Sequence, residues 1–240
     1  MRHTFYILLF FLNPLISQTS SEEIVNLMGR GINMGNVLSA PTEGNWAYAV
    51  YEDYFVQLSE AGFTNVRIPV DFYSGGFLNS DYSLNGSQRS SINIDGCANN
   101  SCFSSNSNTV SNYDGSLDDY QVNQQYLDRV QQIVDWAITH NIIVVLDFHG
   151  NNLKQEFVYT FQNEQINGVN YYTNPTSAKR LADINRFKAI WRDVANRFKD
   201  YSTTTLVFDL INEPYFSVSA DEMNDLNLNL IETVRATGSN

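Results

Sequence analysis

One pattern constrains the fold of this chain more than any other: from residue 29 onward, a short apolar segment is followed by a helical segment four times. Such alternation predicts a parallel sheet with helices packed on it, because parallel strands are joined by long crossover connections. The predicted strands are residues 30–34, 65–70, 142–148 and 205–211, and the predicted helices are residues 46–61, 119–140, 177–198 and 220–236. Two architectures fit this order, an open doubly wound sheet and a (β/α)8 barrel.

Polar residues near the ends of the predicted strands favour the barrel. Arg67 lies in the second strand and His149 follows the third, while Asn212 and Glu213 follow the fourth, just before Pro214. The carboxyl ends of parallel strands share one edge, where barrel enzymes carry their active-site groups. No G-x-G-x-x-G motif follows the first strand, which argues against a nucleotide-binding sheet. Glu213 at a strand exit suits a proton donor to a leaving oxygen when burial favours its protonated form.

These residues also have structural interpretations. Arg67 within an apolar strand could pair with Asp147 or Asp209, since a buried charge needs a partner. His149 could be a strand-end histidine with satisfied hydrogen bonds. Their joint occurrence at successive strand ends favours a functional site.

Charge and composition limit the partners that this chain could have. The 240 residues carry a net charge of −12 and 43% hydrophobic residues, which predicts a globular protein with a sizeable core. An acidic chain without a cluster of Lys and Arg argues against nucleic acid as a partner. The Asp residues of the long polar loop at 71–118 lack the spacing of a calcium loop. We therefore expect neither metal nor cofactor, and a neutral polyhydroxylated substrate.

The first 20 residues predict a signal peptide. Arg2 and His3 precede the apolar residues 5–12, which are too few to span a bilayer, and the polar residues 17–20 follow. Cleavage is expected near residues 17–20; no A-x-A pattern is present there, so an uncleaved anchor stays an alternative. Either form exports the chain, and we expect a secreted or cell-surface protein with no membrane contact after cleavage.

Two cysteines agree with export, because disulfides persist in oxidising compartments. Cys97 and Cys102 lie in one Ser/Asn-rich loop and could close a short disulfide, which the loop-entropy model values at about 2 kcal/mol. With no histidine nearby, this pair makes a poor zinc site. Asn85 and Asn99 begin glycosylation sequons in the same loop, and their use depends on the source organism.

Four segments at the predicted strand ends resemble one enzyme family. They are residues 30–36 (RGINMGN), 61–70 (AGFTNVRIPV), 146–149 (LDFH) and 211–214 (INEP), and in order and spacing they are similar to glycoside hydrolase family 5. The resemblance implies that residues 29–240 form part of that family's catalytic domain. Residues 40–46 (APTEGNW) resemble its cellulase and β-glucanase members in particular.

The resemblance implies a retaining glycosidase with a (β/α)8 TIM-barrel fold. Matched motif by motif, Glu213 would be the acid/base and Asn212 would bond the sugar 2-hydroxyl. Arg67 and His149 would orient a second carboxylate and adjust its ionisation through their charge. A retaining enzyme uses that second carboxylate as its nucleophile, about 5 to 5.5 Å from the acid/base.

Three further residues are expected to bind substrate: Asn36, Trp46 and Asn151. Trp46 could stack on a sugar ring, although such aromatic residues also serve ordinary packing. One residue departs from the family pattern, because Gly150 stands where many members have a second histidine. This departure puts the sugar contacts at that position in doubt.

The resemblance places the nucleophile at the end of the seventh barrel strand, beyond residue 240. We therefore expect a TIM barrel truncated to about its first four βα units, with no nucleophile in this chain and no activity for the chain by itself. The main hypothesis is the N-terminal half of a secreted retaining β-glucan hydrolase that is monomeric when full length.

The alternative is a noncatalytic carbohydrate-binding or dimerising half-barrel, because four parallel strands leave open sheet edges. Other properties of the substrate stay open. The sequence does not distinguish β-1,4, β-1,3 and mixed glucans from one another or from mannan, nor endo from exo attack.

Overall fold

The computed structural model describes residues 20–40, 42–72, 76–77, 90–92, 117, 120–150, 153–154, 157, 161, 165–166, 169–170 and 178–239. Several predictions from the sequence fall outside these ranges. They concern the signal peptide at residues 1–19, the cysteines Cys97 and Cys102, the sequons at Asn85 and Asn99, and the substrate contact Asn151. None of the described helices is long and apolar enough to cross a membrane.

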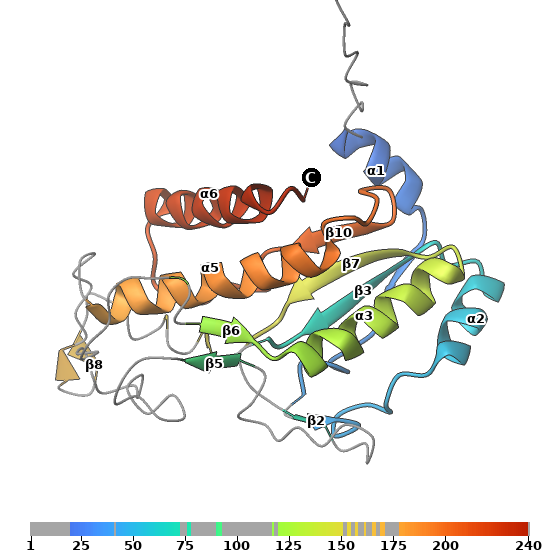
Figure 1. Cartoon of the computed structure of the whole chain (residues 1–240), viewed down its shortest axis with the longest axis horizontal. Coiled ribbons are helices and arrows are strands. Elements are labelled where there is room, and N and C mark those ends of the chain that lie inside the picture. Colours follow the sequence, from blue (N-terminus) through green and yellow to red (C-terminus); the bar gives the residue numbers. More distant parts are fainter. Residues whose placement is uncertain are drawn as a thin grey trace, which may run out of the picture.

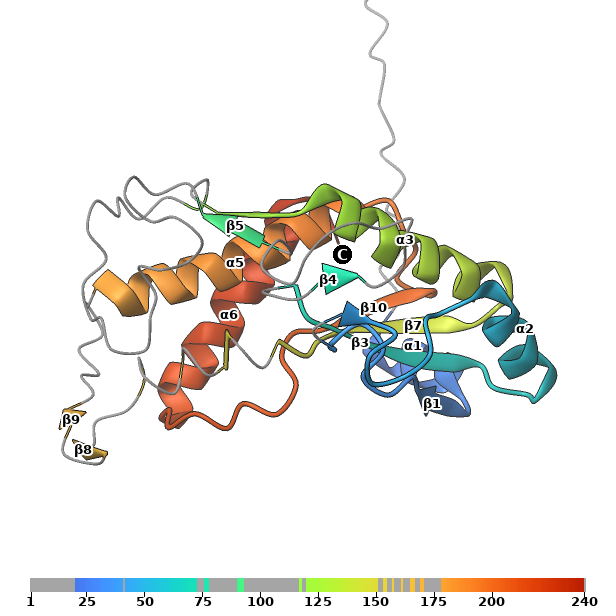
Figure 2. The same ribbon diagram turned by 90° about the horizontal axis from the view of Figure 1, so that it is seen from below.

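Four parallel strands form the central sheet, as the alternating pattern predicts (β3, β7 and β10 in Figure 1; β1 in Figure 2). Their order is β1 (Gly31–Asn33), β3 (Asn65–Val70), β7 (Ile143–Phe148) and β10 (Leu206–Asp209). In this register, Val66 pairs with Val144, which in turn pairs with Leu206. The fourth strand is shorter than predicted: it ends at Asp209, and Leu210 and Ile211 lie beyond it. Sequential neighbours with parallel crossovers are the arrangement of the first half of a barrel sheet.

Three short two-stranded ribbons lie in the connections between these elements. They pair β2 (Thr42–Glu43) with β4 (Gly76–Phe77), β5 (Ser90–Ile92) with β6 (Tyr120–Val122), and β8 (Gln165–Ile166) with β9 (Val169–Asn170). The β5–β6 pair corrects the predicted boundary of the following helix. Residues 120–122 are extended because they pair with β5, and the backbone N–H of Val122 donates to Asp193 (2.8 Å).

Four helices follow the four sheet strands in turn. They are α2 (Glu52–Glu60), α3 (Gln124–Thr139), α5 (Ala178–Phe198) and α6 (Ala220–Ala236). The predicted extents of α5 and α6 are confirmed to within a residue, and Asn123 caps α3 with its side chain. The helix predicted from residue 46 begins only at Glu52, because Val50 donates its N–H to the Glu43 carboxylate and Tyr51 is extended.

Helix α1 (Ser21–Met28) was not predicted from the pattern of strands and helices. Ser20 and Glu23 form a capping box, a signature that the Ser-Ser-Glu-Glu run already contains. The carbonyl of Met28 at its end accepts hydrogen bonds from the side chains of Thr64 and Asn65 (2.6 Å for the latter). These bonds attach α1 to the start of β3.

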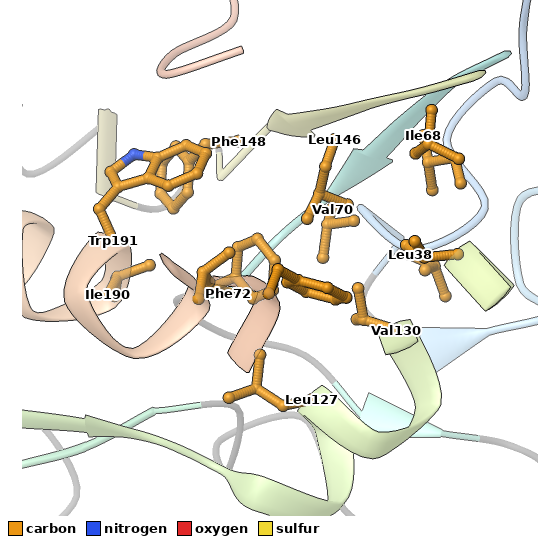
Figure 3. Close-up of a cluster of buried hydrophobic side chains, with 14 of the residues drawn as sticks. Leu38, Ile68, Val70, Phe72, Leu127, Val130, Leu146, Phe148, Ile190 and Trp191 are labelled. Carbon is orange, nitrogen blue, oxygen red and sulfur yellow. The ribbon is translucent and has the colours of Figure 1, made fainter. Parts of the chain in front are cut away.

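The hydrophobic core lies between the sheet and the helices α3 and α5, and Figure 2 shows α3 covering one face of the sheet. Figure 3 shows part of this core, with labelled side chains from the strands and connections (Leu38, Ile68, Val70, Phe72, Leu146, Phe148) and from the two helices (Leu127, Val130, Ile190, Trp191). Strands β3 and β7 alternate between fully and partly buried residues and end in three buried ones. This burial is expected for parallel strands that are covered by helices.

The open side of β10 is apolar. A hollow of about 490 Å³ lies among α1, β10 and α6 and is lined by residues that include Ile24, Met28, Phe208, Leu210 and Val234. On α1, the side chains of Val25 and Leu27 are 66% and 52% exposed. Apolar surface of this extent beside an edge strand is what a barrel would present where its next strand and helix pack.

Candidate active site

The side chain of Arg67 connects the carboxyl ends of all four sheet strands. From β3 its Nη2 contacts Asp147 on β7 (2.9 Å), Asp209 on β10 (3.2 Å) and the Oδ1 of Asn212 (2.8 Å). Its Nη1 donates to Asn33 on β1 (3.3 Å). The ion pairs considered in the structural interpretation therefore both form, but the same guanidinium also orients the Asn212 amide. A planar group with five donors suits such a role.

Asn212, three residues beyond the end of β10, is held at four points. Its N–H donates to the carbonyl of Phe148 (3.0 Å), and its carbonyl accepts from the Lys154 ammonium (2.9 Å). Its side-chain Oδ1 is bound by Arg67, while its Nδ2 lies 3.5 Å from the Nε2 of His149. The amide orientation of Asn212 is assigned from its hydrogen bonds: Oδ1 accepts from Arg67, so the Nδ2 hydrogens point away from Arg67.

His149 and Asp147 form a pair at the end of β7. The Nδ1 of His149 lies 2.9 Å from the Oδ2 of Asp147, whose side chain is fully buried. Burial raises the pKa of Asp147, whereas the hydrogen bond from His149 and the positive charge of Arg67 lower it. With its proton on Nδ1, His149 donates to the Oδ2 of Asp147 and leaves Nε2 as an acceptor toward Asn212.

Glu213 follows Asn212 with an uncommon backbone conformation. Its φ of +43° places it in the left-handed region, which few residues other than glycine adopt. Such conformations persist where the surrounding structure holds them, and they cluster at functional sites. The side chain is exposed, so the burial expected for a proton donor is not provided by the described part of the chain.

Lys154 was not predicted from the sequence. It is only 1% exposed, its ammonium binds the carbonyl of Asn212, and it lies 5.5 Å from the ring centre of Tyr215. Burial lowers the pKa of Lys154, whereas the nearby carboxylates of Glu213, Asp147 and Asp71 raise it. The sequence contained one signal, a lysine five residues after His149 with no charged residue between the two.

Gly150 is explained by its neighbours. A Cβ at this position would lie 2.5 Å from the ring of Phe148 and 3.0 Å from the Oδ1 of Asp71. Phe148 is fully buried and packs on Phe187 with ring centres 4.8 Å apart, so it cannot move aside. Where the resemblance leads one to expect a second histidine, this chain has filled the space with Phe148 and Asp71.

The remaining residues predicted to bind substrate lie apart from this cluster in the chain. Asn36 follows β1, is exposed, and uses its carbonyl to accept from Ala40 (3.1 Å). Trp46 lies between β2 and α2, with 56% of its surface exposed. The structure thus brings together Arg67, His149 and Asn212 and places Glu213 beside them.

Several other carboxylates near the strand ends are already engaged. Glu43 is 1% exposed and forms a two-point pair with Arg129, with Oε1–Nη2 and Oε2–Nε distances of 2.7 and 3.1 Å. Asp147 is buried, as expected from its position within a strand. Asp209 ends β10, which lies at the edge of the described sheet; its side chain is 37% exposed and pairs with Arg67. Asp71 is 5% exposed.

Comparison with known proteins agrees with this geometry. The family model described as cellulase (glycosyl hydrolase family 5) matches residues 27–240. The chain belongs to glycosyl hydrolase family 5. Its parallel sheet is the first part of the (β/α)8 barrel of that family.

Two of the similar curated proteins are endoglucanases. The chain is 27% identical over 215 residues to endoglucanase H of Acetivibrio thermocellus, covering 90% of this chain and 17% of that protein. It is 26% identical over 235 residues to endoglucanase A of Paenibacillus barcinonensis, covering 92% of this chain and 46% of that protein. The chain therefore spans less than half the length of these relatives.

Solved structures give the same fold. The endoglucanase Cel5A of Thermotoga maritima superimposes with a TM-score of 0.58 at 23% identity, covering 90% of this chain and 50% of that one. A tri-modular family 5 (subfamily 4) endo-β-1,4-glucanase of Bacillus licheniformis, solved with cellotetraose, gives a TM-score of 0.59 at 25% identity. The match covers 90% of this chain and 32% of that glucanase.

Proposed function

We propose that this chain supplies the acid/base half of a secreted retaining β-glucan hydrolase. The observation that carries the proposal is the Asn212–Glu213 pair at the end of β10, whose amide is fixed by Arg67 at 2.8 Å. Membership of family 5 and the endoglucanase relatives support the reaction class and the glucan substrate. In a complete barrel, the second half would cover Glu213 and supply the low-dielectric surroundings that a proton donor needs.

Each residue of the cluster has a defined task in this mechanism. Glu213 protonates the leaving glycosidic oxygen and then, as a carboxylate, accepts a proton from the water that attacks the intermediate. The Nδ2 of Asn212, turned away from Arg67, donates to the sugar 2-hydroxyl, a bond that strengthens in the transition state. His149 accepts from the same amide at 3.5 Å and so helps to fix its plane.

The nucleophile is proposed to come from outside these residues. A retaining mechanism needs a second carboxylate about 5 to 5.5 Å from Glu213 on the opposite side of the scissile bond. Among the described residues, Glu43 and Asp147 are buried in ion pairs and Asp209 is bound to Arg67. Because each of these groups is already engaged in an ion pair, none of them is proposed as the nucleophile.

The 240-residue chain by itself is therefore expected to release no reducing ends from carboxymethylcellulose or laminarin. Joining it to the C-terminal half that family 5 barrels have, or adding that half as a separate fragment, is expected to restore hydrolysis. We refer to either product as the complete barrel. A reducing-sugar assay with both substrates measures the difference and also separates β-1,4 from β-1,3 activity.

Two outcomes would contradict this proposal. Hydrolysis by the isolated chain that disappears with Glu213→Gln would place the nucleophile within these residues. A complete barrel that binds cello-oligosaccharides without cleaving them would support the noncatalytic half-barrel alternative.

Export is a second part of the proposal and rests on the apolar residues 5–12 and the two cysteines. The mature chain is expected to begin near residues 18–21, with Cys97 bonded to Cys102. Intact-mass analysis of secreted material, with and without reduction, measures both features. Two free thiols together with a retained Met1 would refute them.

A further inference from the structure

Lys154 is the charged side chain at the site for which the mechanism above has no task. It is almost completely buried, although lysine is rarely buried without a specific partner. Its direct hydrogen bond goes to a backbone carbonyl, that of Asn212, at 2.9 Å. Its backbone N–H donates to the carbonyl of Gly150 (3.2 Å), which anchors the residue in the turn that follows β7.

The contacts of Lys154 lie on both sides of Glu213. The carbonyl that it binds belongs to the Asn212–Glu213 peptide, so the bond fixes the plane from which Glu213 departs at φ +43°. Its ammonium also lies 5.5 Å from the ring centre of Tyr215, two residues further on. Because Lys154 contacts the chain both before and after Glu213, Glu213 has little freedom to leave its left-handed backbone conformation.

We propose that Lys154 is a positioning residue for the acid/base, holding the Asn212–Glu213 peptide so that the Glu213 carboxyl faces the leaving oxygen. The proposal rests on the assignment of Glu213 as acid/base and deepens it. Lys154 touches neither sugar nor reacting atom in this account and acts only through the peptide that it binds. Displacement of a catalytic group by even about 1 Å costs up to two orders of magnitude in rate.

The choice of lysine has a physical reason. A buried ammonium is costly unless carboxylates surround it, and Glu213, Asp147 and Asp71 all act on this one. An apolar side chain would fill the same space without that cost but could not bind a carbonyl. A charged donor binds the Asn212 carbonyl more strongly than a neutral one, because charge-assisted hydrogen bonds are stronger.

The first test compares two substrates in the complete barrel carrying Lys154→Met. A cello-oligosaccharide has a poor leaving group that needs protonation, whereas a dinitrophenyl cellobioside has a good one that needs almost none. We expect kcat/KM to fall by about tenfold or more on the oligosaccharide and by less than about threefold on the dinitrophenyl substrate. Glu213→Gln should give the same pattern, and Lys154→Arg should recover part of the loss.

A matched control separates positioning from general packing. Lys188→Met makes the same substitution in the half-buried Lys188 of α5, which lies among Arg192, Asn196 and Glu232, away from the site. It is expected to leave both kcat/KM values unchanged. Equal losses on both substrates in Lys154→Met would show that Lys154 only stabilises the fold and would overturn the proposal.

A second readout needs no activity and uses the 240-residue chain. The NMR chemical shifts of the Cα and Cβ atoms of Glu213 report its backbone conformation. Comparison with the spectrum of Glu213→Gln identifies which signals belong to Glu213. We expect Lys154→Met to move these shifts away from left-handed values and Lys188→Met to leave them in place. Unchanged shifts in Lys154→Met would overturn the positioning role whether or not the complete barrel hydrolyses glucan. An inactive complete barrel with moved shifts would instead refute the proposed function alone.

Discussion

Replacing Glu213 by Gln in the complete barrel is expected to lower kcat on β-glucan by about 10²-fold or more. An amide has nearly the shape of the carboxyl group but can neither give its proton to the leaving oxygen nor take one from water. The side chain is exposed, and of the three carboxylates near the Lys154 ammonium the variant keeps Asp147 and Asp71, so stability should change little. Reducing-end kinetics and thermal unfolding of the same preparation measure the two effects separately.

The control for this variant is Glu60→Gln, which removes an exposed carboxylate from the end of α2. This substitution changes the net charge by the same amount, but Glu60 lies at the end of α2 that leads into β3, away from the carboxyl ends of the strands. Its kcat should match that of the unmodified barrel. A Glu213→Gln barrel that retains its rate to within about twofold would remove Glu213 from the mechanism.

The sheet could be predicted from the sequence because each of its strands is marked by an apolar run within the strand itself. The predicted strand at residues 142–148 is an almost continuous apolar run, which is typical of a strand covered on both faces, and β7 covers all of it except Ile142. The extents of α5 and α6 likewise follow from helical periodicity. The starts of α2 and α3 could not be predicted, because a carboxylate from residue 43 and a pairing with residues 90–92 decide them. Those partners are distant in sequence.

The site was predictable only in part for the same reason. Strand-end positions identify Arg67, His149 and Asn212, since parallel strands bring their carboxyl ends to one edge. Nothing local connects Lys154 with Asn212, which is 58 positions away and is reached through tertiary packing. Gly150 was recognised as a departure from the family, but the ring of Phe148 that excludes a side chain there becomes visible only in the fold.

The largest effect on stability is expected from Arg129→Met. Arg129 and Glu43 are 4% and 1% exposed, and their two-point pair joins the segment after β1 to helix α3. Arg129 also donates to the carbonyl of Val50 (2.6 Å). Removing one partner leaves the other charge buried and unpaired, which costs about 3–5 kcal/mol. Denaturant unfolding should show this loss, a large share of the roughly 5–15 kcal/mol typical of a domain.

A double variant tests the physical reason for that loss. Combining Arg129→Met with Glu43→Leu removes both charges, so the double variant should be more stable than Arg129→Met alone, because no unpaired carboxylate stays buried. Arg197→Met is the matched control, since Arg197 pairs with the exposed Asp128, and pairs of that kind contribute at most about 1 kcal/mol. If Arg129→Met and Arg197→Met lose the same stability, the Glu43 pair does not hold the segment after β1 in place. If instead only Arg129→Met unfolds early and Glu43→Leu rescues it, Glu43 is assigned to the fold and is excluded as a nucleophile.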